Sequence, residues 1–223
     1  MTTSHPAEPT ILTPNHHAHY PGFAGVGGFL AALTFTVGRT ADADLAIRLT
    51  GVGSADHVVD VGCGPGVAVR RAAASAASVV GVDPAPVMLR VARPLTHQRT
   101  SAVRYVVGAA EALPLPDDSA TVVWSLATVH HWHDLDAGLA EARRVLGPSG
   151  RLLAIERCAE PGARGLGSHG WTDDQARRFA ERCGTAGFAD VEIGHHQPRP
   201  RRRVVSVLAH AHPAANARGE SGR

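Results

Sequence analysis

The sequence Val58-Val59-Asp60-Val61-Gly62-Cys63-Gly64-Pro65-Gly66 determines how the rest of the chain is arranged. Its first four residues predict a parallel strand buried on both faces, because helices cover such a strand on either side and favour a short apolar run. The glycines that follow adopt backbone conformations that other residues avoid, and they let the chain approach a ligand closely. The stretch from Val67 to Ala77 predicts a helix whose first N–H groups point back at this loop. A strand, a glycine loop and a helix in this order indicate a site for a nucleotide-type cofactor, the alternative being a structural turn without a ligand.

The loop itself discriminates between cofactors. A dinucleotide site favours Gly-x-Gly-x-x-Gly, whereas Val67 stands here in place of the third glycine. Asp60, inside the strand, would face a pyrophosphate unfavourably and suits a ligand with a cationic amino-acid head. The run V-D-V-G-C-G-P-G resembles the first motif of class I S-adenosylmethionine-dependent methyltransferases. That resemblance implies that Asp60 and the loop hold the methionine end of S-adenosylmethionine, through Gly62, Cys63, Gly64 and Gly66.

A second acidic residue ends the next predicted strand, Val80-Gly81-Val82-Asp83. A carboxylate at this tip can accept hydrogen bonds from both hydroxyls of a ribose, and Pro84 is suited to the first position of a helix. The alternative is that Asp83 only caps that helix. The family resemblance implies that Asp83 binds the ribose and that the residues from Pro84 to Met88 line the adenosine pocket.

The loop after the third predicted strand, Gly108 to Ser119, departs from the family pattern. The family commonly has an acid just after the glycine, where it contacts the adenine amino group, and this chain has Ala109 there. We therefore expect adenine recognition from the backbone of Ala109 and Ala110, or from Glu111.

The fourth predicted strand ends at Leu126 and leads to His130, His131 and Trp132. Ligands of open α/β sheets bind outside the carboxyl ends of the strands, so these side chains are predicted to meet a methyl acceptor. The segment resembles small-molecule methyltransferases of ubiquinone and menaquinone biosynthesis. His130 is a candidate general base or a pocket residue that makes hydrogen bonds. Trp132 is a candidate to flank the sulfonium or the acceptor through its ring face, or to pack in the core.

Two other functions suggested by local composition are not expected. The runs 16–19 and 130–133 share the spacing HHxH, but adjacent histidines point in different directions, so we predict no metal site. The basic run from Arg199 to Arg203 lacks interleaved aromatic residues and is predicted to be a solvated loop, so no nucleic-acid partner is expected.

From residue 56 onward, strands and helices alternate as in a doubly wound sheet. The last two strands are close in sequence and are predicted to form an antiparallel pair. We therefore expect an α/β, Rossmann-like, seven-stranded sheet, mostly parallel, with one antiparallel strand near the C-terminal edge. Strands are predicted at 57–62, 78–82, 102–107, 120–126, 151–155, 190–194 and 203–209, and helices at 66–77, 84–96, 134–146 and 172–186.

The predicted organisation is a flexible arm at 1–20, a helical lid or cap segment at 21–53, an S-adenosylmethionine-binding domain at 54–209 and a disordered tail at 210–223. The uncharged segment 20–38 is diluted by glycine and threonine, so we do not expect it to insert stably into a membrane. We expect it to close over the site, which would favour an apolar or aromatic acceptor.

Composition is that of an ordinary globular protein. The 223 residues are 44% hydrophobic and 19% charged, and a formal charge of +2 gives no reason to expect a polyanionic partner. The three cysteines have no metal spacing and are predicted to be reduced thiols of a cytoplasmic protein.

The sequence thus predicts methyl transfer from S-adenosylmethionine to a small-molecule acceptor. Two alternatives remain open at this point: an NAD(P)-dependent oxidoreductase, and a non-catalytic cofactor-binding protein.

Overall fold

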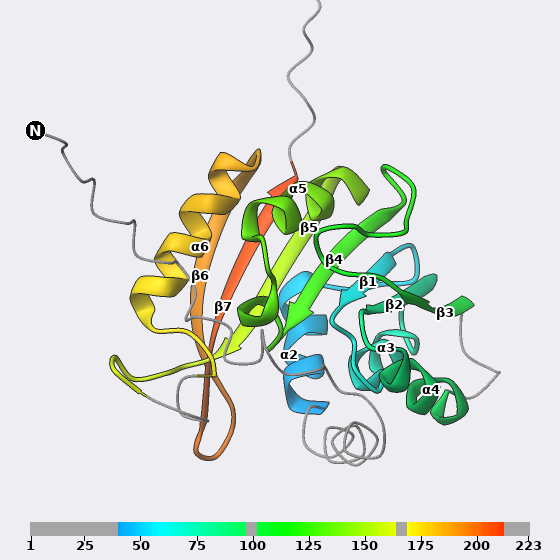
Figure 1. Cartoon of the computed structure of the whole chain (residues 1–223), viewed down its shortest axis with the longest axis horizontal. Coiled ribbons are helices and arrows are strands. Elements are labelled where there is room, and N and C mark those ends of the chain that lie inside the picture. Colours follow the sequence, from blue (N-terminus) through cyan, green and yellow to red (C-terminus); the bar gives the residue numbers. More distant parts are fainter. Residues whose placement is uncertain (1–39, 97–101, 164–168, 212–223) are drawn as a thin grey trace, which may run out of the picture.

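The computed structural model describes residues 40–96, 102–163 and 169–211 (Figure 1). The predicted arm, the uncharged segment 20–38 and the histidines of 16–19 lie outside these residues, as does the tail from 212 onward. The helices are α2 (Thr40–Thr50), α3 (Val67–Ala72), α4 (Pro86–Leu95), α5 (Leu135–Val145) and α6 (Asp173–Thr185), with a 3₁₀ turn η1 (Val129–His131). The strands are β1 (His57–Val61), β2 (Ser78–Asp83), β3 (Ala102–Val107), β4 (Ala120–Leu126), β5 (Leu146–Arg157), β6 (Phe188–Arg199) and β7 (Arg202–Ala211).

The seven strands form one sheet in the order β3-β2-β1-β4-β5-β7-β6. The pairs among β1 to β5 are parallel, whereas β7 runs antiparallel to both of its neighbours, β5 and β6. The chain order reverses beside β1, so β1 and β4 lie at the switch point where open α/β sheets bind ligands. The predicted fold class is confirmed.

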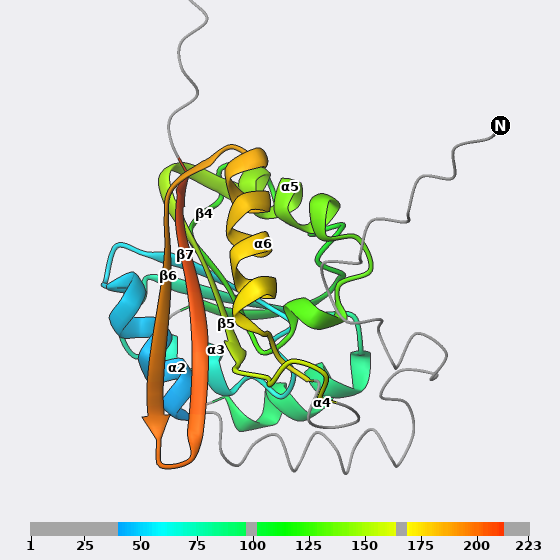
Figure 2. The same cartoon turned by 90° about the vertical axis from the view of Figure 1, so that its left-hand side faces the viewer.

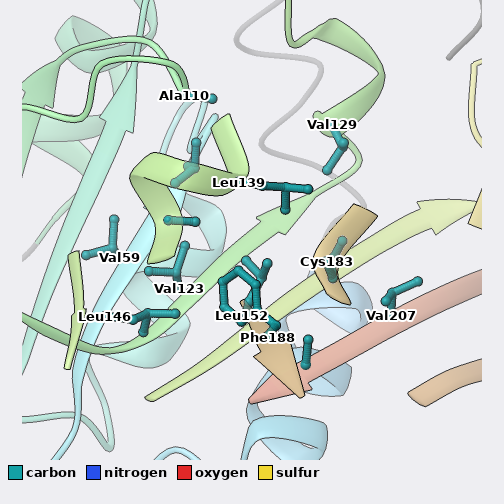
Figure 3. Packing of buried hydrophobic residues seen from close by; sticks show 14 of the residues in the cluster. Val59, Ala110, Val123, Val129, Leu139, Leu146, Leu152, Cys183, Phe188 and Val207 are labelled. Carbon is teal, nitrogen blue, oxygen red and sulfur yellow. The ribbon is translucent and has the colours of Figure 1, made fainter. Parts of the chain in front are cut away.

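Helices cover both faces of the sheet (Figure 2). Apolar residues of α2, α3 and α4 pack on one face, around Val58, Val79 and Trp124. On the other face, Leu139 of α5 and Cys183 of α6 pack with Leu152 of β5, as Figure 3 shows. The middle strands are therefore buried on both sides, which is why their sequences are continuous apolar runs rather than alternating ones.

Three boundaries differ from the sequence prediction by five residues, and the other differences are smaller. Helix α3 ends at Ala72 instead of 77, and the chain continues through short turns to β2. Strand β5 begins at Leu146, paired with Ala120, instead of at 151, and its register against β4 shifts before Arg151. The basic stretch predicted as a solvated loop largely extends β6 and β7, which pair as far as Arg199 and Arg202.

Part of the segment predicted as a cap, residues 40–50, forms α2 and packs against α3 and the sheet. Two arginines hold it there. Arg202 of β7 forms an ion pair with Asp42, and the Arg151 guanidinium donates to the carbonyl of Thr50 and to Asp56. Thus charged groups at both ends of α2 fix the helix against the sheet.

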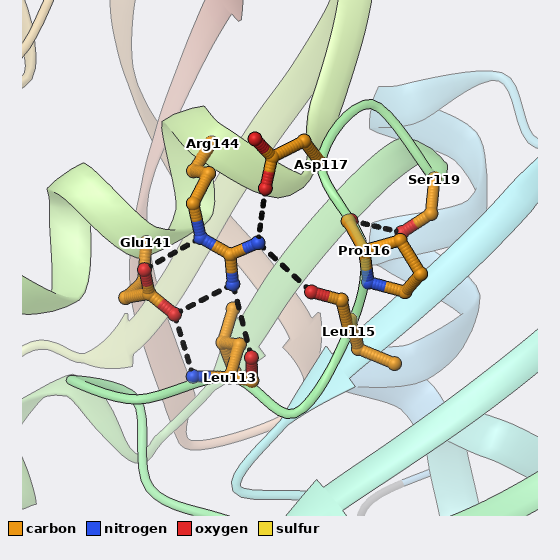
Figure 4. A network of polar contacts seen from close by, with 7 residues as sticks. All are labelled: Leu113, Leu115, Pro116, Asp117, Ser119, Glu141 and Arg144. Carbon is orange, nitrogen blue, oxygen red and sulfur yellow. Dashed lines mark hydrogen bonds and ion pairs between the residues drawn. The ribbon is translucent and has the colours of Figure 1, made fainter.

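A network around Arg144 fixes the connection between β3 and β4 (Figure 4). The Arg144 guanidinium donates to both carboxylate oxygens of Glu141 at 2.7 and 2.8 Å, and to Asp117 at 2.6 Å. It also donates to the carbonyls of Leu113 and Leu115, while Glu141 accepts from the Leu113 N–H at 2.7 Å. Two side chains of α5 therefore fold the loop that follows residues 109–111 onto that helix.

Glu141→Gln tests the charge in this network. Hydrogen bonds from Arg144 lower the pKa of Glu141 below its ordinary value of 4.5, so the stabilisation is present at neutral pH and is lost as pH falls through the lowered folded-state pKa. Because the carboxylate is partly exposed, we expect a loss of about 1 kcal/mol in urea unfolding at neutral pH. The difference from wild type should shrink towards zero on the acid branch.

Arg177→Gln is the matched control, because its pair with Asp174 has the same i,i+3 spacing on an exposed helix surface. It should change the unfolding free energy by no more than about 0.5 kcal/mol. A Glu141→Gln deficit that stayed constant down to acid pH would show that the charge of Glu141 is not what stabilises the loop.

Candidate functional site

The carboxyl ends of β1, β2, β3, β4 and β5 meet along one edge of the sheet (Figure 1). Polar and glycine-rich segments follow these strands, and they hold nearly all of the residues that the sequence singles out. The segments are residues 62–66 after β1, Asp83 at the end of β2, residues 108–111 after β3, residues 127–132 after β4, and Glu156 near the end of β5.

The glycine loop requires glycine for the conformational reason that the sequence suggested, and also because other segments of the protein approach it closely. Gly62, Gly64 and Gly66 have φ of 76°, 52° and 75°, a region that residues with a Cβ rarely adopt. The loop is also tightly enclosed. A Cβ at Gly62 would lie 2.6 Å from the Thr128 Oγ1, and a Cβ at Gly66 would overlap the Tyr105 hydroxyl. The close approach is therefore to neighbouring protein segments at two of the three glycines.

Asp83 ties this loop to the second strand. Its Oδ2 accepts the Gly64 N–H and its Oδ1 accepts the Ala85 N–H, both at 2.8 Å. The side chain is 7% exposed, and burial raises its pKa while the two N–H donors oppose that rise. The bond to Ala85 fits the helix-capping alternative. An ionised carboxylate has about four lone-pair positions, so two remain for hydroxyl donors of a ligand.

Several other predicted site residues are buried rather than exposed. Asp60, Cys63, Met88 and Leu126 are all at most 8% exposed, whereas Pro84 is exposed. Burial raises the pKa of the Cys63 thiol well above its ordinary value, with further contributions from the nearby carboxylates. Cys63 is therefore a protonated, packed residue at neutral pH rather than a nucleophile.

Glu111 connects two of the loops. Its Oε1 accepts the N–H groups of His133 at 2.5 Å and Asp134 at 3.2 Å, just before α5 begins. Ala109 and Ala112 form an isolated antiparallel bridge, which makes 109–112 a tight turn. The Glu111 Oε1 is already occupied by these backbone donors. Of the two candidates for contacting adenine, the backbone of Ala109 and Ala110 is therefore favoured over the Glu111 side chain.

The turn after β4 is attached to the glycine loop. The Thr128 hydroxyl donates to the Val61 carbonyl at 3.0 Å, next to its contact with Gly62. Ala127 has φ of 58°, a strained conformation for a residue with a Cβ, and its N–H donates to the Ile155 carbonyl at 2.7 Å. The hydrogen bond to β5 keeps Ala127 in this conformation, which turns the chain from β4 into η1.

His130, on η1, contacts an acid that the sequence analysis missed. Its Nδ1 lies 2.9 Å from the Glu156 Oε2, and the side chains are 10% and 0% exposed. The ring centroid of His131 lies 4.0 Å from that of His130, with the two planes tilted by 49°, and the ring of His169 lies 5.6 Å from that of His130. A signal for Glu156 was present: it is the acid that follows the apolar run Leu152–Ile155, as Asp83 follows the apolar run of β2.

Trp132 belongs to the core. It is 9% exposed, and a Cβ at Gly138 of α5 would fall 2.5 Å from a ring carbon of Trp132. Glycine at 138 thus lets the indole ring pack directly on the helix. This is the packing role that the sequence left open for Trp132, and its position supports η1 from beneath.

Within the described ranges, no group of three or more His, Cys, Asp or Glu side chains is arranged to hold a metal ion. The helices of these same ranges are too short or too polar to cross a bilayer.

Comparison with known proteins gives a consistent result. Residues 59–154 match the family model described as "Methyltransferase domain". The chain is 36% identical over 126 residues to the malonyl-[acyl-carrier protein] O-methyltransferase of Serratia marcescens, covering 55% of this chain and 48% of that protein. It is 32% identical over 111 residues to a demethylmenaquinone methyltransferase of Tropheryma whipplei, covering 50% and 46%. The chain therefore spans about half the length of these curated relatives.

The fold agrees as well. The phosphoethanolamine N-methyltransferase 2 of Haemonchus contortus, solved in complex with S-adenosyl-L-methionine, superposes with a TM-score of 0.71. The alignment covers 89% of this chain and 60% of that chain at 16% identity, so it establishes the shared fold.

Substituting the loop glycines tests how tightly the loop is enclosed. Gly64→Ala places a Cβ in open space and incurs only the strain of its positive φ, about 1–2 kcal/mol in urea unfolding. Gly66→Ala has the same strain and also overlaps Tyr105, so it should cost about 1–3 kcal/mol more.

Combining Gly66→Ala with Tyr105→Phe should recover part of that extra cost, because the hydroxyl is the atom that the new Cβ meets. Equal losses for Gly64→Ala and Gly66→Ala would mean that Tyr105 does not enclose the loop.

Proposed function

We propose that this protein is a class I S-adenosylmethionine-dependent methyltransferase, which transfers the methyl group of S-adenosylmethionine to a small-molecule acceptor. The match of residues 59–154 to a methyltransferase domain supports this proposal. The observation that carries the proposal is the Asp83 carboxylate bonded to the Gly64 N–H, at the carboxyl ends of β1 and β2. The family match does not support either alternative considered from the sequence, the NAD(P)-dependent oxidoreductase or the non-catalytic binding protein.

The residues present fit the cofactor. A buried carboxylate with two lone-pair positions to spare suits the ribose hydroxyls, and three of the five residues in the loop 62–66 beside it carry no side chain. In this proposal Asp60 and the loop 62–66 hold the methionine end, and Asp83 holds the ribose. The backbone of Ala109 and Ala110 contacts the adenine, and Pro84, Met88 and Leu126 line or support the pocket.

When bound, S-adenosylmethionine supplies a methyl group that its positive sulfur already activates. The task left to the chain is alignment of the acceptor and exclusion of water, which can contribute on the order of 7–11 kcal/mol. Residues 126–132 are suited to that task, because Thr128 attaches the turn to the glycine loop and Trp132 anchors it in the core.

For the acceptor, we propose an apolar or aromatic small molecule rather than a nucleic acid. The uncharged segment 20–38 supports this, as does a relative named for demethylmenaquinone. The three cysteines are free thiols, which supports a reducing, cytoplasmic location.

Calorimetric titration with S-adenosylmethionine, S-adenosylhomocysteine and NAD tests the cofactor assignment. We expect both adenosyl ligands to bind and NAD not to bind. Asp83→Ala should weaken the adenosyl ligands by about 100-fold or more, because it removes two hydrogen bonds to a charged group at about 1.5–3 kcal/mol each.

Asp44→Ala is the control, since it removes a carboxylate that pairs with Arg71 on the exposed surface of α2 and α3. It should leave the affinities unchanged. If the wild-type protein bound neither adenosyl ligand, or if binding were indifferent to Asp83, the proposed function would be wrong.

A further inference from the structure

The pair of His130 and Glu156 is the feature of this edge that cofactor binding does not use. Glu156 is fully buried, and it comes at the end of the apolar run Leu152–Ile155. Its Oε2 contacts the His130 Nδ1 at 2.9 Å, and its Oε1 has no hydrogen-bond partner among the residues that the structure describes. Burying a carboxylate is costly unless it is paired, so a role confined to stability would be better served by an apolar residue.

With the Glu156 carboxylate ionised, the contact sets the tautomer of His130. An ionised carboxylate only accepts hydrogen bonds, so the Nδ1 of the ring must donate. In the neutral imidazole the proton then sits on Nδ1, and the Nε2 presents a lone pair. This arrangement leaves the ring ready to accept a proton at Nε2.

The position of the pair suits a reaction at the cofactor. η1 follows β4 directly, and Thr128, two residues before His130, contacts the glycine loop through Val61 and Gly62. Glu156 comes from the adjacent strand β5, whose Ile155 carbonyl holds the strained Ala127. The same two strands therefore fix both members of the pair relative to the loop.

We propose that His130 is the general base for a hydroxyl-bearing acceptor and that Glu156 is the residue that positions it; this rests on the proposed function. The His130 Nε2 takes the proton of the acceptor hydroxyl as the oxygen–methyl bond forms. The methyl–sulfur bond breaks with its electron pair going to sulfur, and the products are a methyl ether, S-adenosylhomocysteine and a protonated His130. An acceptor that is already ionised, such as a carboxylate, needs no such base.

The deciding readout is the tautomer, which is independent of any acceptor. Protein labelled with ¹⁵N-histidine is saturated with S-adenosylhomocysteine, and the ring nitrogens are recorded at alkaline pH, with His130→Gln giving the assignment. We expect a protonated Nδ1 and an unprotonated Nε2 in wild type, and loss of this preference in Glu156→Leu. A proton on Nε2 in wild type, or a preference that Glu156→Leu leaves unchanged, would overturn the proposal.

The chain supplies an internal control for this spectrum. His195 also lies 2.9 Å from a carboxylate, Asp173, but it contacts it through Nε2, and both side chains are largely exposed. Its signals should be unaffected by Glu156→Leu. If both histidines changed together, the variant would have perturbed the protein as a whole, and Glu156→Gln, which keeps the shape of the side chain, would replace it in the same comparison.

Kinetics then separate a base from a structural residue. Naphthohydroquinone and para-cresol are the hydroxyl probes, and benzoate is the ionised one. On a hydroxyl probe that the wild-type protein methylates, His130→Gln should lower kcat by about 10²–10⁴-fold with little change in KM. Glu156→Gln should lower kcat by about 10-fold or more. The double variant His130→Gln/Glu156→Gln should be no slower than His130→Gln alone, because Glu156 acts through the imidazole of His130. His195→Gln, at the exposed side chain that pairs with Asp173, should leave kcat within about 2-fold if His130 is the base.

Failure of this inference is distinguishable from failure of the proposed function. Without binding of either adenosyl ligand, the function itself is wrong. With binding intact, an unchanged kcat in His130→Gln, or a larger loss in His131→Gln, would overturn the role of His130 alone.

Discussion

The hydrogen bond from the Gly64 N–H to the Asp83 carboxylate is the constraint on which the site depends. It joins the loop after β1 to the end of β2, and the other oxygen of the same carboxylate holds the start of α4 through Ala85. One buried acid therefore fixes a loop, a strand end and a helix start. Its raised pKa reflects the cost of placing a carboxylate where water is scarce. A buried carboxylate at the end of an otherwise apolar strand is the pattern expected of a functional position.

The two halves of the edge are built differently. On the side of β1, β2 and β3, glycines and backbone donors dominate, and the protein offers a shape with one acid in it. On the side of β4 and β5, side chains make the polar contacts. Thr128 donates to the Val61 carbonyl, and His130 contacts Glu156. The first half suits a ligand that is always the same, and the second suits chemistry that differs from one acceptor to another. Family resemblance therefore informs the first half more than the second.

The fold and the cofactor half could be predicted from sequence because they rest on local patterns. Apolar runs gave the strands, and Asp60, Asp83 and the glycines stand beside them in the chain. The pairing of His130 with Glu156 spans 26 positions and depends on the register of β5 against β4, which local patterns do not contain. Trp132 was ambiguous for a similar reason, since only the approach of Gly138 shows that its ring is packed. The start of β5 also differed from the prediction, because its pairing with β4 begins at Ala120. Helix α3 ends at Ala72, earlier than the local pattern predicts.

The contact between Gly62 and Thr128 has a mechanical consequence. There is no room for a Cβ between the loop after β1 and the turn after β4, so these two segments are closely packed and a shift of one displaces the other. A movement of the loop towards a ligand would therefore reach Thr128 and, two residues later on η1, the imidazole of His130. If the proposed cofactor binds at this loop, the packing favours an order of binding in which the cofactor comes before the acceptor.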